Sequence, residues 1–337
     1  MANDVNLRSE VAIIIPCYNA APYLARAIES IFAQTYRDHC IYVIDDGSTD
    51  GTEAVLQSYA GRIVSLRQEH CGQSSARNHG IRVSESPYIA FLDADDEWLP
   101  DKLERQITLL RQAPRTGMIY SDCLTSGSGP AAGSYFARIG IPSGGRVFQR
   151  FLKTCEVYTP TVVIRRECLL DVGGFDETLP VGEDYNLWLR IAAGWDVEVI
   201  PEALAIRHVT PGSLSRTTSR EQVASNVITV LEKVQEACPG LAPHERQALQ
   251  VAMGWRHYAY GSYLLARGDR RQSRVQFLNS WRHGVHNWRP IAGLGLGLLP
   301  HQTSMMLKNI YKGLRSSRAQ ASPTTNRDAA DPNATPR

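Results

Sequence analysis

Two segments of strand-forming residues each end at a cluster of aspartates, and this repeated pattern constrains the fold most. Residues 41–44 (IYVI) lead into residues 45–50 (DDGSTD), and residues 88–92 (YIAFL) lead into residues 93–96 (DADD). Carboxylates at the end of a buried strand repel one another and lose hydration, so a cation or a helix terminus has to compensate them. The pattern predicts strands that end on a polar edge, which is either a divalent-metal site or a set of helix caps.

Helical segments alternate with the strands along the first two thirds of the chain. Residues 11–16 form a continuous apolar run, as in a strand buried on both faces of a parallel sheet, and residues 22–34 carry apolar residues at helical spacing. This alternation predicts an open α/β sheet, mixed but mainly parallel, flanked by helices. Ligands of such sheets bind beyond the carboxyl ends of the strands, so both aspartate clusters belong on one rim. The Gly-, Ser- and Pro-rich residues 125–145 predict a mobile loop over that rim.

After about residue 217 the pattern predicts helices alone. Residues 252–267 and 270–283 predict a helical hairpin. Residues 303–318 predict a basic amphipathic helix, which either lies on an anionic membrane or packs on the body of the protein. Residues 319–337 have the Ser, Pro, Thr and Asn content of a disordered tail.

Charge is distributed unevenly along the chain. Between residues 247 and 327 there are twelve Lys and Arg and one acid, Asp269, although the formal net charge of the whole chain is only +2. The basic C-terminal helices therefore favour peripheral association with a membrane surface, and we expect no nucleic-acid partner. We expect an α/β domain over residues 1–216, a helical region over residues 217–318 and a tail over residues 319–337.

Cysteine usage and the absence of an apolar leader indicate the compartment. The seven cysteines show no metal-binding spacing and lie mainly in apolar stretches, as reduced thiols do. The first ten residues are polar, and no apolar run reaches the ~20 residues that a spanning helix needs. We expect a cytoplasmic protein that could attach to the inner face of the cell membrane.

Five sequence blocks occur in a fixed order. They are residues 14–19 (IIPCYN), 43–50 (VIDDGSTD), 75–78 (SARN), 91–96 (FLDADD) and 182–190 (GEDYNLWLR). With these blocks the chain resembles the family 2 glycosyltransferases, inverting enzymes of the GT-A fold. The resemblance implies a catalytic domain that moves a sugar from a nucleotide-diphosphate donor, with a UDP-sugar favoured, to a hydroxyl group. The acceptor would be a carbohydrate or a lipid-linked molecule in cell-surface polysaccharide or glycolipid synthesis.

The resemblance also implies a site for the donor nucleotide. Pro16 and Tyr18 would frame the base, and Asp45 and Asp46 would accept hydrogen bonds from the base or from sugar hydroxyls. Arg77 would approach the nucleotide or the carboxylates of the metal site. The alternatives are an Asx turn for Asp46 and a surface salt bridge for Arg77.

Residues 93–95 match the DxD motif of the family, which implies a bound Mg²⁺ or Mn²⁺. Asp95 would hold the ion and Asp93 would contact the ion or the ribose, while Asp96 would have a structural role. The ion would neutralise charge on the departing nucleoside diphosphate. Asp184 matches the family's general base, which takes the proton of the acceptor hydroxyl. Alternatively, Glu183 and Asp184 favour the positive end of a helix.

Residues 207–216 (RHVTPGSLSR) resemble the segment R-x-H-P-G-S-x-S that follows the family's core. His208 could then touch the diphosphate or the metal, and Ser213 or Arg216 could close over the donor. The insertion of residues 209–210 shifts the spacing by two. The sequence therefore leaves two alternatives for His208, a ligand of the diphosphate or metal and a structural residue.

The same residues argue against other functions. A sugar-nucleotide pyrophosphorylase usually has a glycine-rich loop with Arg and Lys after the first strand, where this chain has residues 17–21 (CYNAA). A dinucleotide-binding dehydrogenase would need G-x-G-x-x-G at that point. A third alternative is a binding protein that keeps the fold but catalyses no reaction. The presence of all four carboxylates, Asp45, Asp93, Asp95 and Asp184, argues against this alternative.

Overall fold

The computed structural model describes residues 7–127, 132–154, 156–210 and 219–299, together with residues 302, 303 and 306. Within it the chain forms two compact units, Met1–Arg256 and His257–Arg337. Several predictions fall outside the described residues, namely the roles of Ser213 and Arg216, most of the helix over residues 303–318 and the tail over residues 319–337.

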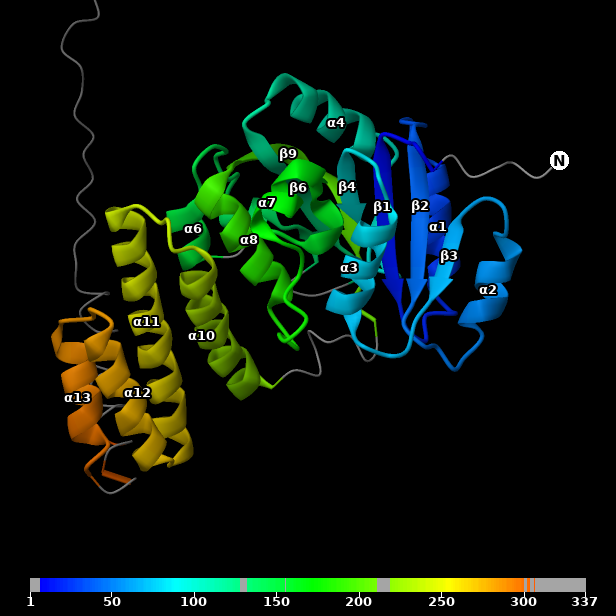
Figure 1. The fold of residues 1–337 in the computed structure, drawn as a ribbon. Coiled ribbons are helices and arrows are strands. Elements are labelled where there is room, and N and C mark those ends of the chain that lie inside the picture. Colours follow the sequence, from blue (N-terminus) through cyan, green and yellow to red (C-terminus); the bar gives the residue numbers. More distant parts are fainter. Residues whose placement is uncertain are drawn as a thin grey trace, which may run out of the picture. The chain divides into compact units, whose positions relative to one another are not determined.

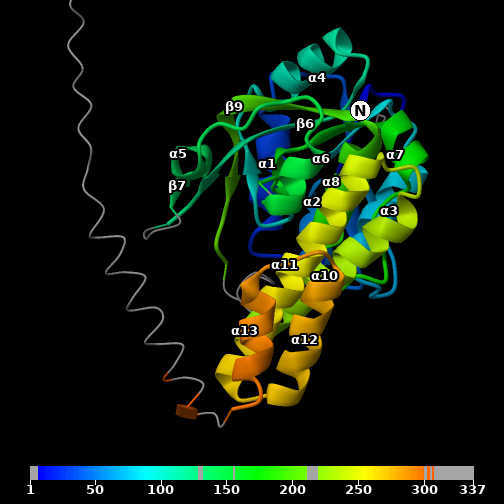
Figure 2. The ribbon, with the colours of Figure 1, turned by 90° about the vertical axis from the view of Figure 1, so that its left-hand side faces the viewer.

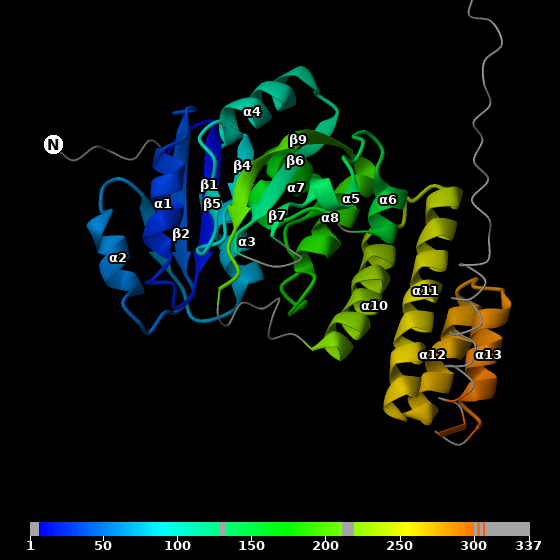
Figure 3. The same cartoon turned by 180° about the vertical axis from the view of Figure 1, so that it is seen from behind.

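A mixed sheet is the centre of the first unit (Figures 1 and 3). Its described strands are β1 (Val11–Cys17), β2 (His39–Asp45), β3 (Val64–Arg67), β4 (Tyr88–Phe91), β5 (Glu97–Trp98), β6 (Thr116–Thr125), β7 (Gly133–Ser134), β8 (Val163–Arg165) and β9 (Asp196–Arg207). The strand order is β3-β2-β1-β4-β8-β6-β9-β5, with β7 paired to β6. Strands β1 to β4 pair in parallel, whereas β8 and β5 run antiparallel to their neighbours. The predicted fold class is confirmed.

Helices cover both faces of this sheet. The described helices of the first unit are α1 (Leu24–Phe32), α2 (Thr52–Ser58), α3 (Gln73–Val83), α4 (Lys102–Gln112), α5 (Phe136–Ile139), α6 (Phe148–Lys153), η1 (Thr159–Thr161), α7 (Arg166–Val172), α8 (Glu183–Gly194), α10 (Arg220–Ala237) and the first part of α11 (Pro243–Arg267). Strand β1 sends Ala12 and Ile14 into the core under α3, α7 and α8, and Ile13 and Ile15 into the core under α1 and α4. Burial on both faces explains its continuous apolar sequence.

The first compact unit extends beyond the last strand. Its core includes Val230 of α10 and both Leu249 and Met253 of α11. The predicted boundary at residue 216 follows the change from strands to helices, and an amphipathic helix does not reveal which surface it packs on. The structural unit therefore runs to Arg256, while the functional division of the chain stays a prediction.

Residues 125–145, which the sequence predicts as a loop, contain regular structure. They form β7 and the single turn α5, apart from residues 128–131, which lie outside the described part. The Asp122 carboxylate accepts a hydrogen bond from the backbone N–H of Phe136 (2.9 Å) and one from the Ser134 hydroxyl. The Phe136 ring is buried in the core. The Phe136 ring and the Asp122 carboxylate thus hold regular structure in a segment whose Gly and Ser content predicts a loop.

Strand β9 runs from Asp196 to Arg207, although Pro201 interrupts its sequence. Its pairing with β6 passes from Ser121 opposite Ile200 to Asp122 opposite Ala203, so Pro201 and its neighbour bulge out of the ladder. A proline lacks the N–H that a ladder needs, which explains the break in the sequence pattern.

The second unit is a helical hairpin followed by a third helix (Figure 2). Helix α11 ends at Arg267, and α12 (Arg270–Arg282) begins after Asp269, whose carboxylate accepts from the backbone N–H of Gln272 (3.0 Å). The predicted hairpin is confirmed. Helix α13 (Trp288–Leu296) packs on α12 through Phe277. Among the described residues, no helix combines the length and the apolar content of a membrane span.

Gly80 sets the closest approach between α3 and β1. A Cβ atom at this position would lie 2.6 Å from Cγ2 of the buried Ile14. Overpacking of this kind costs about 1–3 kcal/mol, and the helix preference of alanine returns up to about 1 kcal/mol. We therefore expect Gly80→Ala to lower the free energy of unfolding by about 1–2 kcal/mol in urea denaturation. Gly240→Ala is the matched control because a Cβ there meets no atom within 4 Å. Equal stability of the two variants would contradict the close packing.

Candidate active site

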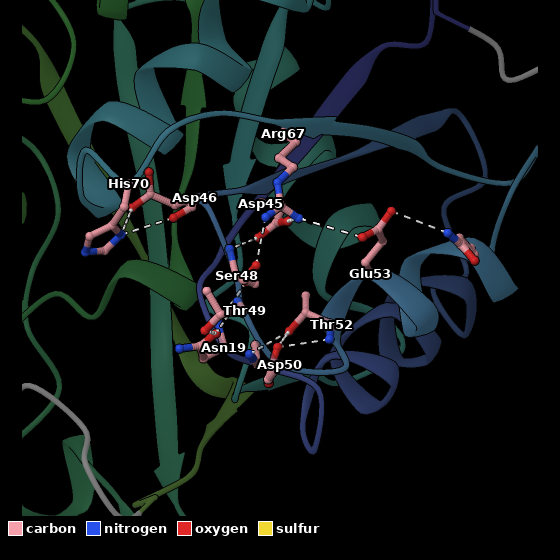
Figure 4. A network of polar contacts seen from close by, with 12 residues as sticks. Asn19, Asp45, Asp46, Ser48, Thr49, Asp50, Thr52, Glu53, Arg67 and His70 are labelled. Atoms are coloured by element: carbon pink, nitrogen blue, oxygen red, sulfur yellow. Dashed lines mark hydrogen bonds and ion pairs between the residues drawn. The ribbon is translucent and has the colours of Figure 1, made fainter.

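Asp45 ends β2 and holds the turn that follows it (Figure 4). Its Oδ1 accepts a hydrogen bond from the backbone N–H of Ser48 (2.9 Å), and its Oδ2 pairs with Nη1 of Arg67 (3.0 Å). Gly47 has a φ of +79°, which a side chain rarely adopts. The buried Asp45 carboxylate is thus engaged by the protein on both oxygens.

Asp46 fastens the end of β2 to the loop before α3. It accepts hydrogen bonds from the backbone N–H groups of Cys71 (2.9 Å) and Gly72 (2.8 Å) and from Nε2 of Gln68 (2.8 Å). Its Oδ2 also lies 2.9 Å from Nδ1 of His70 (Figure 4). The structure brings Asp45 and Asp46 to the predicted rim, in buried positions and with protein partners. Their contact with a nucleotide stays a prediction.

An exposed pair of rings lies beside these aspartates. Tyr18 follows β1, is 47% exposed and stacks on His70 with ring centroids 4.1 Å apart and an interplanar angle of 27°. Pro16 lies two residues before Tyr18 and is buried within β1. Stacked rings at the carboxyl ends of the strands offer a flat apolar face to a planar ligand. The sequence analysis did not identify His70. The only indication in the sequence is its position two residues before Gly72, the N-cap of α3.

Arg77 is the buried centre of the site. Its Nη2 donates to Oδ1 of Asp93 (2.7 Å), and its Nη1 donates to Oε1 of Glu183 (3.0 Å), which also accepts from Nε2 of Gln73 (2.7 Å). Only 2% of Arg77 is exposed, so a surface salt bridge is excluded. Burial would lower the pKa of Arg77, but the carboxylates of Asp93 and Glu183 outweigh it and raise that pKa. One guanidinium thus joins the end of β4 to the start of α8.

The aspartates after β4 lie in a turn, closed by a hydrogen bond from the backbone N–H of Asp96 to the carbonyl oxygen of Asp93 (3.0 Å). Asp93 and Asp95 are half-buried, and Asp96 is buried. Oδ2 of Asp95 accepts from the Thr210 hydroxyl (2.8 Å), and Oδ1 of Asp96 accepts from the backbone N–H of His208 (2.9 Å). Burial, together with the charges of Asp93 and Asp95, raises the pKa of Asp96 to about 8.

This turn has the chemistry of part of a metal site. Among the described residues, no three His, Cys, Asp or Glu side chains converge into a complete metal cage. Asp93 and Asp95 supply carboxylate oxygens, which Mg²⁺ and Mn²⁺ prefer, and such ions commonly take their remaining ligands from phosphate and water. The turn gathers three carboxyl groups within four residues, Asp93, Asp95 and the buried Asp96, and a cation would offset their charge. The residues therefore fit a divalent ion shared with a diphosphate.

His208 stands beside the same turn. Its Nε2 lies 2.6 Å from Oε1 of Glu97, and the Glu97 carboxylate also pairs with Nε of Arg26 (3.1 Å). Nη2 of Arg26 donates to the carbonyl oxygen of Asp95 (2.7 Å). The His208 ring is therefore engaged by a carboxylate, and its contact with metal or diphosphate stays a prediction. Arg26, Glu97 and Thr210 carry no motif that the sequence could reveal.

Asp184 lies in the first turn of α8, directly after Gly182 and Glu183. A helix N-terminus would lower its pKa, but burial and the neighbouring Glu183 carboxylate raise the pKa of Asp184 to about 7. The two adjacent acids thus have different environments, because Glu183 pairs with Arg77. A carboxylate with a pKa near neutrality suits a general base, since it is both available as the anion and basic enough to take a proton.

Comparison with known proteins identifies the family of this chain. The family model for glycosyl transferase family 2 matches residues 12–167. The Escherichia coli UDP-Glc:alpha-D-GlcNAc-diphosphoundecaprenol beta-1,3-glucosyltransferase WfgD is 32% identical over 192 residues, which are 56% of this chain and 72% of that protein. The chain belongs to glycosyltransferase family 2, as its five sequence blocks predict.

Solved structures share the GT-A fold. Staphylococcus aureus TarS 1-349 in complex with UDP-GlcNAc superimposes with a TM-score of 0.66 at 16% identity, over 94% of this chain and 93% of that one. The mannosyltransferase PcManGT from Pyrobaculum calidifontis, in complex with GDP-Man and Mn²⁺, gives a TM-score of 0.58 at 20% identity, over 96% and 90% of the two chains. The chain spans 27–58% of the length of five other curated relatives.

The Arg77 bridge predicts a large stability effect. We expect Arg77→Ala to lower the free energy of unfolding by about 3–5 kcal/mol, because Glu183 and Asp93 would lose the charge that compensates them. Urea denaturation measures this loss. Arg115→Ala is the matched control, since that side chain is 87% exposed and pairs with Asp196 at 3.9 Å. The control should change stability by less than about 1 kcal/mol. Similar losses in both variants would disprove the special role of Arg77.

Proposed function

We propose that this protein is an inverting glycosyltransferase that moves a sugar from a nucleotide-diphosphate donor to a hydroxyl acceptor. The observation that supports it most is the Arg77 bridge, because it links the carboxylates of the metal-type turn to the helix that begins with Glu183 and Asp184. A group-transfer enzyme needs a cation for the leaving diphosphate and a base for the attacking hydroxyl, held at a fixed separation.

The donor is a UDP-sugar in this proposal. The name of WfgD specifies UDP-Glc, and TarS was solved with UDP-GlcNAc. In this chain, the Tyr18–His70 ring pair would stack on the base, with Asp45 and Asp46 at its edge. Pro16 would frame the same site from within β1. PcManGT carries GDP-Man, so GDP-sugars are the first alternative for a donor screen.

Asp95 and Asp93 would hold Mg²⁺ or Mn²⁺ at the donor diphosphate. PcManGT was solved with Mn²⁺ beside its donor. The ion would neutralise the negative charge that the departing nucleoside diphosphate gains. Arg77 would orient Asp93 through its 2.7 Å hydrogen bond, and Thr210 would orient Asp95.

Asp184 would act as the general base. Its carboxylate would accept the proton of the acceptor hydroxyl as the hydroxyl oxygen attacks the anomeric carbon. A bond forms between that oxygen and the anomeric carbon, and the bond to the phosphate oxygen breaks on the opposite side. The electron pair leaves with the diphosphate, and a single displacement of this kind inverts the configuration.

The acceptor would be a lipid-linked carbohydrate used in cell-surface glycan synthesis. The name of WfgD specifies an acceptor attached to diphosphoundecaprenol. An acceptor of this class resides in a membrane, so the protein would work at the inner membrane surface. The identity of the transferred sugar depends on side chains around the donor, for which no sequence motif exists in this chain.

A donor panel tests the proposal. We expect nucleotide release from one or more UDP-, GDP- or dTDP-sugars when Mg²⁺ or Mn²⁺ is added. Asp184→Asn should reduce turnover by about 10²–10⁴-fold while calorimetry still detects donor binding. Asp95→Ala should abolish the metal dependence of donor binding. Glu177→Gln is the control, since that side chain is exposed in the loop before α8. If no donor binds or releases nucleotide, and Asp95→Ala behaves as the unaltered protein does, the protein is not an enzyme of this class.

The pH dependence tests the base. Because the pKa of Asp184 is raised to about 7, the anion is lost as pH falls below that value. We expect kcat/KM to be constant on the alkaline side and to fall about tenfold per pH unit on the acid side. Glu183→Gln removes a charge that raises the pKa of Asp184, so the acid limb should move to lower pH. An acid limb that stays in place in Glu183→Gln would show that another group titrates.

A further inference from the structure

Helix α13 exposes large apolar side chains. Trp288 is 54% exposed and Ile291, one turn further along the same side of the helix, is 55% exposed. Leu298, just after the helix, is 72% exposed. The opposite side, with Pro290 and Gly293, is buried. Single exposed apolar residues are ordinary, but a tryptophan and two large aliphatic residues within eleven positions are not.

The outer side of α12 adds a second exposed stripe. Arg271, Val275, Leu278 and Arg282 follow one another at intervals of four, three and four residues, so they share one side of the helix. All four are exposed, and the buried residues of this helix, such as Phe277, lie on the opposite side. The stripe therefore has an apolar middle with an arginine at each end.

The charge of this region is one-sided. Residues 270–299 contain five arginines and no aspartate or glutamate. Some of this charge has a structural role, since Nη1 of Arg274 donates to the carbonyl oxygen of Gly297 (3.1 Å). Arg271 and Arg282 flank the exposed apolar residues. A surface of this composition attracts a partner that is both apolar and negatively charged.

An anionic lipid surface has this chemistry. Tryptophan prefers the headgroup region of a bilayer, aliphatic side chains enter the acyl boundary, and each arginine near the surface contributes about 1 kcal/mol. A second copy of the chain would bring Arg271 and Arg282 near the same two residues of its partner, which like-charge repulsion disfavours. We propose that the outer surface of α12 and α13, defined by Arg271, Val275, Leu278, Arg282, Trp288, Ile291 and Leu298, binds anionic membranes. The binding does not depend on the transferase reaction.

Vesicle co-sedimentation of the full chain tests this surface. We expect binding to vesicles of phosphatidylcholine mixed with phosphatidylglycerol, weakening as salt is raised, and much weaker binding to phosphatidylcholine alone. Replacing both Arg271→Gln and Arg282→Gln should weaken the affinity roughly thirtyfold, since about 2 kcal/mol is removed. Replacing Trp288→Gln and Ile291→Gln should weaken it further and should abolish any blue shift of tryptophan fluorescence that the vesicles cause.

Matched controls come from the first unit. Leu170→Gln removes a 74% exposed leucine of α7, and Arg115→Gln removes an exposed arginine, so both should bind vesicles as the unaltered protein does. Circular dichroism checks that each variant is folded, and donor turnover should be equal in all of them. Vesicle binding that survives both double variants would overturn the proposal. So would a dimer in light scattering that the Trp288 and Ile291 variant converts to a monomer, because a second copy would then cover this surface.

Discussion

The site depends on one buried cation between two carboxylates. Arg77 comes from α3, Asp93 follows β4 and Glu183 opens α8, so two consecutive elements and a helix 106 residues further along share one set of hydrogen bonds. Burying a guanidinium is costly unless its charge is compensated, and the carboxylates of Asp93 and Glu183 provide that compensation. The side-chain oxygen of Gln73 accepts a further hydrogen bond from Nη2 of Arg77 (3.4 Å). The position of the carboxylate turn and the position of Asp184 are consequently coupled. A shift of α8 relative to the turn at residues 93–96 would therefore strain the Arg77 pairs with Asp93 and Glu183.

The same arrangement separates the roles of two adjacent acids. Glu183 is neutralised by Arg77. The pKa of Asp184 rises to about 7, mainly because the carboxyl group is buried and lies beside the charge of Glu183. Neighbouring side chains of similar chemistry thus acquire different protonation behaviour from their surroundings. A helix N-terminus by itself would lower the pKa of both acids, so the raised pKa of Asp184 comes from burial and from the charge of Glu183.

Much of the framework follows from the sequence, whereas the partners within the site do not. The apolar runs of β1, β2 and β4 identify buried strands, and their carboxyl ends identify the rim. The partners are set by tertiary contact: Arg67 reaches Asp45 across 22 residues, and Glu183 reaches Arg77 across 106. No local pattern carries such information. Asp45 and Asp46 match a family motif, yet their buried hydrogen bonds to the protein, and the stacked His70, became visible only in the fold.

The link between β4 and β5 has a further consequence. Only residues 92–96 join these strands, although β8, β6 and β9 lie between them in the sheet order. In a flat sheet, four strand spacings would put about 19 Å between β4 and β5. A five-residue link does not reach that far, because residues 93–96 fold back on themselves. The sheet therefore has to curl until its edge strand β5 comes close to β4. The turn at residues 93–96 is the link that holds these two strands together. The residues that carry the carboxylates therefore also constrain the curvature of the sheet.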